Sequence, residues 1–399
     1  MAPPFVTPLK QWIEMLASMD YVQVTIEDQK RLTGILDTRF LTWFSPCIWG
    51  ESDGYNGIRN FLHGTALGRA IVNTFWGILG NDVLTLMDFD SHPETAKLKP
   101  KTLPMFTADS FSILNYDGDF LELVRSGKVQ IHESDFERLS PGKVHLSDGT
   151  SFEADAMLAG TGWKHSPPMK FLPEGIEAEL GLPHEMTEKA PLEDLANQQD
   201  LFRRADAEIT QRFPRLKDEH VWNEDYVPVT KIDGIDVDSK DATTKPLTSY
   251  MLHNFIVPPS ERFLRPRDIA FVGMVGTFSN TIAAHIQGLW VSAYFLGSLA
   301  KDPANAVGDE AAMQHLRYQT VLSNRWGKWR YPTDWGTNKT PCFIFDAVPY
   351  LDLLQNDLGV KPHRKGGAVA EIWSPYMAKD YQTINDEWEK ARVSSKIAV

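Results

Sequence analysis

The stretch that decides the fold occupies residues 155–168 and reads Asp-Ala-Met-Leu-Ala-Gly-Thr-Gly-Trp-Lys-His-Ser-Pro-Pro. The apolar run is typical of a β-strand that is covered on both faces. Gly160 and Gly162 permit backbone angles that a Cβ atom would block, and the two prolines prevent the turn from continuing as a helix. The stretch therefore predicts a buried strand that ends at a ligand site, since ligands of open α/β sheets bind beyond the carboxyl ends of the strands. The alternative is an ordinary exit from a strand into a loop, in which the glycines serve only the turn.

A second apolar run, at residues 268–281, also ends in glycines and is followed by an apolar stretch at 282–296. This order predicts a strand, a glycine-rich turn and a helix that begins at Asn280 or Thr281. Because apolar residues surround most of this helix, we expect it to be buried. The two predicted strands should lie in one sheet, with their glycine turns facing the same cavity.

Polar side chains at the start of this helix are the candidate catalytic residues. His285, Gln287 and Asn280 are predicted to donate hydrogen bonds to a substrate carbonyl. His285 should lie one turn inside the helix, where the positive helix end and apolar surroundings keep its imidazole neutral. The alternative is that His285 only bonds a nearby main-chain carbonyl. The residues predicted to contact the substrate are Thr161, Trp163, His165, Ser279 and Trp290.

These stretches resemble the last shared blocks of fungal flavin-containing monooxygenases and their Baeyer–Villiger relatives, a class B flavoprotein family with an Ala-Thr-Gly-Tyr/Trp turn and a late strand, turn and helix beside the flavin. Segments 49–50, 61–65, 79–82, 141–149 and 326–332 also resemble the fungal branch. Members of this family carry a Gly-x-Gly-x-x-Gly fingerprint for FAD and a second one for NADPH. Here the Gly-x-Gly at 160–162 has His165 at its third position and runs into two prolines. The resemblance therefore implies an N-terminally truncated relative that lacks the FAD-binding fingerprint.

The expected fold class is α/β, with a partial Rossmann-type sheet surrounded by helices and long loops. Period-two alternation predicts strands at 128–132 and 143–147, followed by a tight turn at Asp148-Gly149. A helix or a helical pair is expected at 58–79, and helices are expected at 119–125, 193–213, 311–324 and 343–358. The predicted domains are a mainly helical part at 1–100, a degenerate dinucleotide-binding-like core at 101–172 and 266–300, an irregular insert or lid at 173–265, and a helical part at 301–399.

Composition narrows the class of partner. The 399-residue chain has a net charge of −13, which argues against nucleic acid or an anionic membrane as the main partner. Cys47 and Cys342 are its two cysteines, so no disulfide framework and no cysteine-based metal site is expected. The sequence contains neither a signal-peptide pattern nor an apolar run of about 18 residues, which favours a soluble cytoplasmic protein without membrane insertion.

Two further features favour structural roles over chemistry. His63, beside a glycine, is interpreted as a hydrogen-bonded structural residue more readily than as a catalyst. The interleaved arginines and tryptophans at 325–332 are expected to pack cation over ring inside the protein rather than to bind nucleic acid.

A flavoprotein scaffold without its flavin site predicts chemistry that needs no cofactor. The leading hypothesis is a cyclase or isomerase of fungal secondary metabolism, in its sharpest form a Diels–Alderase or other pericyclase, acting on a small apolar polyketide, terpenoid or alkaloid intermediate. Such an enzyme would use neither cofactor nor metal. One alternative is a fragment or split part of an FAD/NADPH-dependent monooxygenase, and another is a non-catalytic binding or scaffold protein.

Overall fold

The computed structural model describes residues 37–100, 102–106, 119–160, 169–184, 192–217, 248–277, 279–332 and 341–397. The chain divides into two compact units, which are described separately. The larger comprises residues 25–80, 101–111 and 167–399, and the smaller comprises 1–24, 81–100 and 112–166. The four-part division expected from the sequence stays a prediction.

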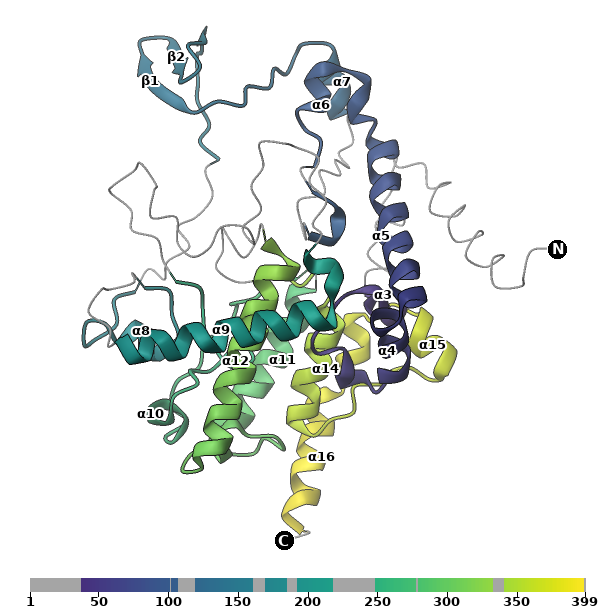
Figure 1. Ribbon diagram of the computed structural model, residues 1–399, viewed down its shortest axis with the longest axis vertical. Helices are drawn as coiled ribbons and strands as arrows, with labels where there is room; N and C mark the ends of the chain where they lie inside the picture. Colours follow the sequence, from purple (N-terminus) through teal and green to yellow (C-terminus); the bar gives the residue numbers. More distant parts are fainter. Residues whose placement is uncertain are drawn as a thin grey trace, which may run out of the picture. The chain divides into compact units, whose positions relative to one another are not determined.

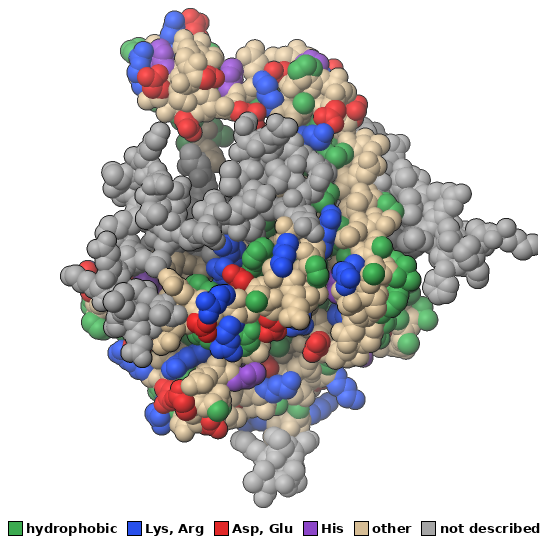
Figure 2. All heavy atoms as spheres, viewed as in Figure 1, with side chains coloured by type: hydrophobic (Ala, Val, Ile, Leu, Met, Phe, Trp, Pro, Cys, Tyr) green, Lys and Arg blue, Asp and Glu red, His purple; other side chains and the backbone are tan. Residues whose placement is uncertain are grey.

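The larger unit is mainly α-helical in its described residues (Figure 1). Figure 2 shows both basic and acidic side chains exposed on the face in view. Helix α9 (Leu192–Arg212) packs against α12 (Glu310–Arg330), and α11 (Asn280–Phe295) packs against α14 (Ala347–Leu358). Its other α-helices are α3 (Arg39–Phe44), α4 (Asn56–Gly64), α8 (Ile176–Leu180), α10 (Glu261–Leu264), α15 (Ala368–Trp373), α16 (Ile384–Ile397) and the part of α5 (Ala66–Met87) that ends at Gly80. Short 3-10 turns are η2 (Gly50–Asp53), η4 (Pro104–Phe106), η5 (Pro214–Lys217), η7 (Pro303–Ala306) and η8 (Ala378–Tyr381).

Helix α12 shows how local sequence sets the boundaries of these helices. The carboxylate of Asp309 accepts hydrogen bonds from the N–H groups of Ala311 and Ala312, which satisfies two unpaired donors of the first turn. The helix ends at Arg330, and Pro332 follows its C-cap. The predicted helix at 311–324 is therefore confirmed, but it extends through the tryptophan-rich segment that the sequence placed beyond it.

Aromatic side chains fill the centre of the larger unit. The Trp49 ring meets Trp326 edge-on with ring centroids 4.7 Å apart, and Phe343 with centroids 5.2 Å apart. Phe343 in turn contacts Phe255 and Tyr350. These five rings come from segments that are far apart in the sequence, so burying them together joins the helices into one unit.

The smaller unit contains η3 (Phe89–Ser91), α6 (Pro93–Ala96), α7 (Phe120–Arg125) and a three-stranded antiparallel sheet. The sheet order is β1 (Phe136–Ser140), β2 (Lys143–Leu146) and β3 (Ser151–Glu153). The predicted strand at 143–147 and the turn at Asp148-Gly149 are confirmed, with Gly149 at a φ of 87°. Helix α7 is also confirmed, since Asp119 caps it and Gly127 follows in the left-handed region. The strand expected at 128–132 is wrong, because the partner of β2 is Phe136–Ser140.

The strand expected at 155–160 is not formed. This segment follows β3 without regular hydrogen bonding, and the Leu158 side chain is 98% exposed. The segment at 268–273 is likewise irregular, although the N–H of Phe271 donates to the carbonyl of Ile256. An apolar run is a strand only where another strand pairs with it, and neither run has such a pairing in the described residues.

The described residues do not form the expected Rossmann-type sheet, which stays a prediction for the chain. The chain combines helices and strands, but the sheet in its described part is small, antiparallel and largely exposed. A single bridge between Gly276 and Cys342 is the parallel pairing found in these ranges. Neither Gly160 nor Gly273 follows a strand in the described residues.

Two glycines in α5 give a matched test of the contact between α4 and α5. A Cβ atom on Gly68 would lie 2.0 Å from the carbonyl oxygen of Phe61, whereas one on Gly77 would meet nothing within 4 Å. Gly68→Ala should lower the free energy of unfolding by about 1–3 kcal/mol, since the backbone must shift. Gly77→Ala should raise it by up to about 1 kcal/mol through helix propensity. Urea unfolding of both variants measures the difference, and equal effects would contradict the close approach of the two helices.

Candidate functional site

Residues 43–50, here called the central strap, form the segment around which the polar interior is built. It runs from the end of α3 to η2, and its carbonyl oxygens are bonded by side chains of surrounding helices. The carbonyls of Trp43, Phe44, Pro46 and Gly50 accept hydrogen bonds from His63, Trp76, Trp326 and Arg59 at 3.0, 2.9, 2.6 and 2.9 Å, respectively. The donors come from α4, α5 and α12, so the strap fixes the positions of these helices relative to one another.

A buried ionic cluster lies beside the central strap. Asp346 accepts a hydrogen bond from the Ser45 hydroxyl at 2.6 Å and another from the Tyr331 hydroxyl. The Arg330 Nε lies 3.4 Å from the same carboxylate. The Arg330 guanidinium also lies 4.4 Å from the centre of the Tyr331 ring. The expectation that the arginines of this segment pack over rings inside the protein is confirmed for Arg330.

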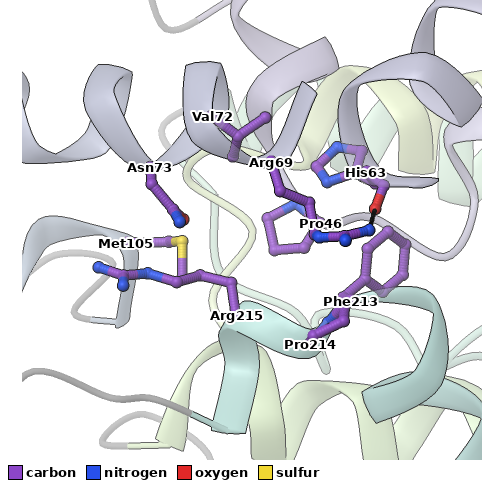
Figure 3. Close-up of a pocket in the computed structure, with 9 residues that line it drawn as sticks. All are labelled: Pro46, His63, Arg69, Val72, Asn73, Met105, Phe213, Pro214 and Arg215. Carbon is purple, nitrogen blue, oxygen red and sulfur yellow. Dashed lines mark hydrogen bonds between the residues drawn. The ribbon is translucent and has the colours of Figure 1, made fainter. Parts of the chain in front are cut away.

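A small pocket opens next to the strap (Figure 3). Its polar lining comes from α4, α5 and the turn after α9, through His63, Arg69, Asn73 and Arg215. Its apolar walls are Pro46, Val72, Met105, Phe213 and Pro214. The interior has room for about one water-sized molecule, so it holds one end of a ligand at most.

His63 is the titratable side chain of this pocket. Burial lowers the pKa of His63 to about 4, so its ring is neutral near pH 7. Because the partner of Nε2 is the carbonyl oxygen of Trp43, Nε2 carries the proton and donates. The interpretation of His63 as a hydrogen-bonded residue is confirmed, and its neutral ring adds no positive charge to the pocket.

Two of the residues predicted on α11 are core residues. The Gln287 amide donates to the Tyr350 hydroxyl at 2.9 Å and accepts from the N–H of Gly273 at 3.4 Å. Trp290 is fully buried, and its Nε1 donates to Asp357 at 3.1 Å. These bonds hold α11 against α14 and against the turn that precedes α11. Both side chains therefore lie in the packed interior.

The other candidates on α11 lie elsewhere. His285 is exposed, with Nε2 3.1 Å from Asn385 Oδ1, because it is two residues from Gln287 and therefore on another face of the helix. Asn280 accepts from the N–H of Thr277, which shapes the turn ahead of the helix. The helix itself is confirmed, but the expectation of full burial, with His285 in a shielded cavity, is wrong.

Ser279 makes a different contact from the one expected. Its hydroxyl lies 3.3 Å from a carboxylate oxygen of Asp37, and burial raises the pKa of Asp37 to about 6. The candidates Thr161, Trp163 and His165 fall outside the described residues. Their roles in substrate contact stay predictions, as do the catalytic roles of His285, Gln287 and Asn280.

The described residues do not fit a dinucleotide. A pyrophosphate needs a glycine turn between a parallel strand and the N-terminus of a helix. Gly160 follows no strand, and the N-terminus of α11 already faces the Asp37 carboxylate, which repels phosphate. Among the described residues there is also no group of three or more His, Cys, Asp or Glu side chains that fits a metal ion. Within the same ranges, every helix is too short or too polar to cross a lipid bilayer.

Comparison with known proteins relates the chain to fungal FAD-dependent monooxygenases. It is 28% identical over 361 residues to the FAD-dependent monooxygenase DEP4 of Alternaria brassicicola, which is 90% of this chain and 56% of that relative. It is 28% identical over 365 residues to the FAD-dependent monooxygenase rstn6 of Aspergillus nomiae, covering 89% of the chain and 57% of the relative. It is 29% identical over 325 residues to the FAD-dependent monooxygenase resA of Aspergillus sclerotiorum, covering 80% and 50%. No family model and no solved structure matches the chain.

These similarities confirm the relation to fungal FAD-dependent monooxygenases that the sequence motifs indicated. The chain spans about half the length of the curated relatives it matches.

Proposed function

We propose that this chain acts as the helical, cofactor-free part of an FAD-dependent monooxygenase that oxygenates a small apolar metabolite in fungal secondary metabolism. The observation that carries the proposal is the extent of the similarity, which covers 80–90% of this chain but 50–57% of each relative. The segment of this chain that matches the relatives contains described residues that do not fit a dinucleotide. In this arrangement FAD is held by elements other than the described residues of this chain.

The relatives' names favour this monooxygenase proposal over the cyclase or isomerase predicted from the sequence. The cyclase hypothesis expected an apolar cavity with donors such as His285, Gln287 and Asn280, and of these His285 is exposed. The cyclase, including its Diels–Alderase form, stays a prediction that no observation on the described residues favours.

The flavin content of the purified chain tests the first half of the proposal. We expect a colourless protein whose melting temperature does not rise with added FAD or NADPH, because a ligand stabilises a protein only by binding its folded state. Visible spectra after gel filtration and thermal melts measure both. Stoichiometric flavin that survives gel filtration would show that the chain holds FAD alone.

A chimaera tests the second half. The portion of the Alternaria brassicicola relative that this chain does not match can be fused to the chain and compared with the same portion expressed alone. We expect flavin-dependent consumption of NADPH and dioxygen that is higher in the fusion, since the chain supplies the missing part of the enzyme. A fusion that binds flavin but is no more active than the portion alone would overturn the proposal.

A further inference from the structure

Helix α5 carries an exposed side that contains no charged residue. In the part of the helix that belongs to the larger unit, the Leu67 side chain is 64% exposed and that of Ile71 is 40% exposed. The exposed residues between 66 and 80 include Leu67, Ala70, Ile71, Thr74 and Gly77, and none of the exposed residues in this range is charged. Their spacing of three or four residues places them along one side of the helix. An exposed helix side of this composition indicates an interaction surface rather than a solvated one.

A row of packed aromatic rings connects this side of α5 to α15. Trp373 of α15 stacks on Phe40 with ring centroids 4.2 Å apart. Phe40 contacts Phe44 at 5.1 Å, and Phe44 stacks on Phe75 of α5 at 4.3 Å. Phe75 lies one turn after Ile71, so the row ends beside the exposed side of α5.

The exposed part of α15 is also apolar. Val369 is 75% exposed and lies one turn before Trp373, which is 44% exposed. We call the surface made by Leu67, Ile71, Val369 and Trp373 the α5–α15 face. Figure 2 shows hydrophobic side chains gathered where Figure 1 draws α5 and α15. Charged residues make up 23% of the chain, so their absence from the exposed side of α5 matches the depletion of charge at the centres of protein interfaces.

The length of the relatives indicates what covers this face. The matched segments make up 50–57% of each relative, so nearly half of each relative has no counterpart in this chain. A second copy of the chain is disfavoured, because it would bring together two molecules that each have a net charge of −13. A lipid surface is disfavoured because helices that lie on membranes are rich in lysine and arginine, and Arg69 is the one such residue between 66 and 80.

We propose that the α5–α15 face docks the portion of the monooxygenase that binds flavin. The proposal rests on the proposed function, because it names the partner that this function requires. Docking removes the exposed side chains of Leu67, Ile71 and Val369 from water, which is the main driving force of such association. The flavin-binding portion then contacts the larger unit through apolar side chains and not through ion pairs, so its affinity should depend little on salt.

Binding of the two purified parts tests the docking directly. The portion of the Alternaria brassicicola relative that this chain does not match is produced with its flavin and titrated with the full chain. Ile71→Glu and Val369→Glu should each weaken binding at least about tenfold, because each would enclose a carboxylate in an apolar interface without a counter-ion. Val393→Glu is the control. Val393 is 46% exposed on α16, away from α5 and α15 (Figure 1), and its replacement should leave the affinity unchanged.

A milder variant covers the case in which a glutamate variant does not fold. Leu67→Gln introduces no charge at a mostly exposed helix position, so it should keep the melting temperature of wild type and still weaken binding. Unchanged affinity in the folded variants, or an equal loss in Val393→Glu, would overturn the docking face. So would a dimer of the chain alone, or its flotation with phosphatidylcholine vesicles, if the same variants abolish that behaviour.

The outcome for the docking face can be separated from the outcome for the proposed function. If the face variants weaken binding but the fusion with the unmatched portion is no more active than that portion alone, the docking face stands and the proposed function fails. If the fusion is active but the face variants bind like wild type, the proposed function stands and the docking face is wrong.

Discussion

Replacing Arg39 with methionine should lower the free energy of unfolding by about 3–5 kcal/mol. Arg39 is fully buried and forms ion pairs with Asp352 and Glu371, the latter at 2.7 Å. Its Nη2 also donates to the carbonyl of Pro362 at 2.9 Å. Methionine fills a similar space but leaves the buried Asp352 carboxylate without its counter-ion. Burial already raises the pKa of Asp352 to about 6 with the arginine present.

The matched control is Arg203→Met, which removes an arginine from an exposed pair with Asp200. Such pairs contribute about 0–1 kcal/mol, so this variant should unfold close to wild type in urea. Adding Asp352→Leu to Arg39→Met should restore part of the loss, because the unpaired charge is then gone. If Arg39→Met and Arg203→Met cost the same, the buried network does not stabilise the fold.

Replacing Asp357 with alanine should lower the free energy of unfolding by about 2–4 kcal/mol. One oxygen of its carboxylate accepts from Trp290 Nε1 at 3.1 Å and from Asn254 Nδ2 at 2.8 Å. Alanine leaves two buried donors without an acceptor, whereas asparagine keeps an oxygen at that position. Asp357→Asn should therefore lose much less stability than Asp357→Ala, and an equal loss in both would contradict the role of these hydrogen bonds.

The same residue predicts a pH dependence. Burial raises the pKa of Asp357 to about 7 from the model-compound value of 3.8, so between these values the folded state holds a proton that the unfolded state has lost. The stabilisation from that proton is complete below pH 3.8 and is lost as the pH rises through 7. Asp357→Asn has no such proton, so its melting temperature relative to wild type should rise between pH 4.5 and 7.5. A constant difference over this range would contradict the raised pKa.

The comparison with a variant is needed because buried histidines act in the opposite direction. Burial lowers the pKa values of His63 and His253 to about 4. Between pH 4 and 6.5 these rings are protonated in the unfolded state and neutral in the folded state, so stability rises with pH. Both histidines are present in wild type and in Asp357→Asn, so their effect cancels in the difference.

The helices could be predicted from the sequence because their signals are local. The cap and glycine around α7, the apolar spacing of α9 and the N-terminus of α11 are each set by residues within a few positions of one another. The strands at 155–160 and 268–273 were wrong because an apolar run followed by glycines specifies flexibility and apolarity but not a pairing partner. Pairing is a long-range property that a single run does not contain.

The candidate site was predicted less well for the same reason. Gln287 was predicted as a catalytic donor and Trp290 as a substrate contact. Both are buried on α11, and their partners Tyr350 and Asp357 lie more than 60 residues away in the sequence. Arg69 and Arg215 carried no local signal, because each is an ordinary charged residue on a helix or turn. Only the folded chain brings them to one pocket.

The contacts of the central strap and of Arg39 delay folding during synthesis, because their partners are made last. Arg39 bonds Asp352 across 313 positions, and Ser45 bonds Asp346 across 301. At the translation rates of about 5–20 residues per second, roughly 15–60 seconds separate the emergence of Arg39 from that of its partner. During that time the aromatic residues of the strap have left the ribosome but have nothing to pack against. We therefore expect slower translation between residues 46 and 346 to increase aggregation rather than improve folding, and the soluble fraction of the expressed protein measures this effect.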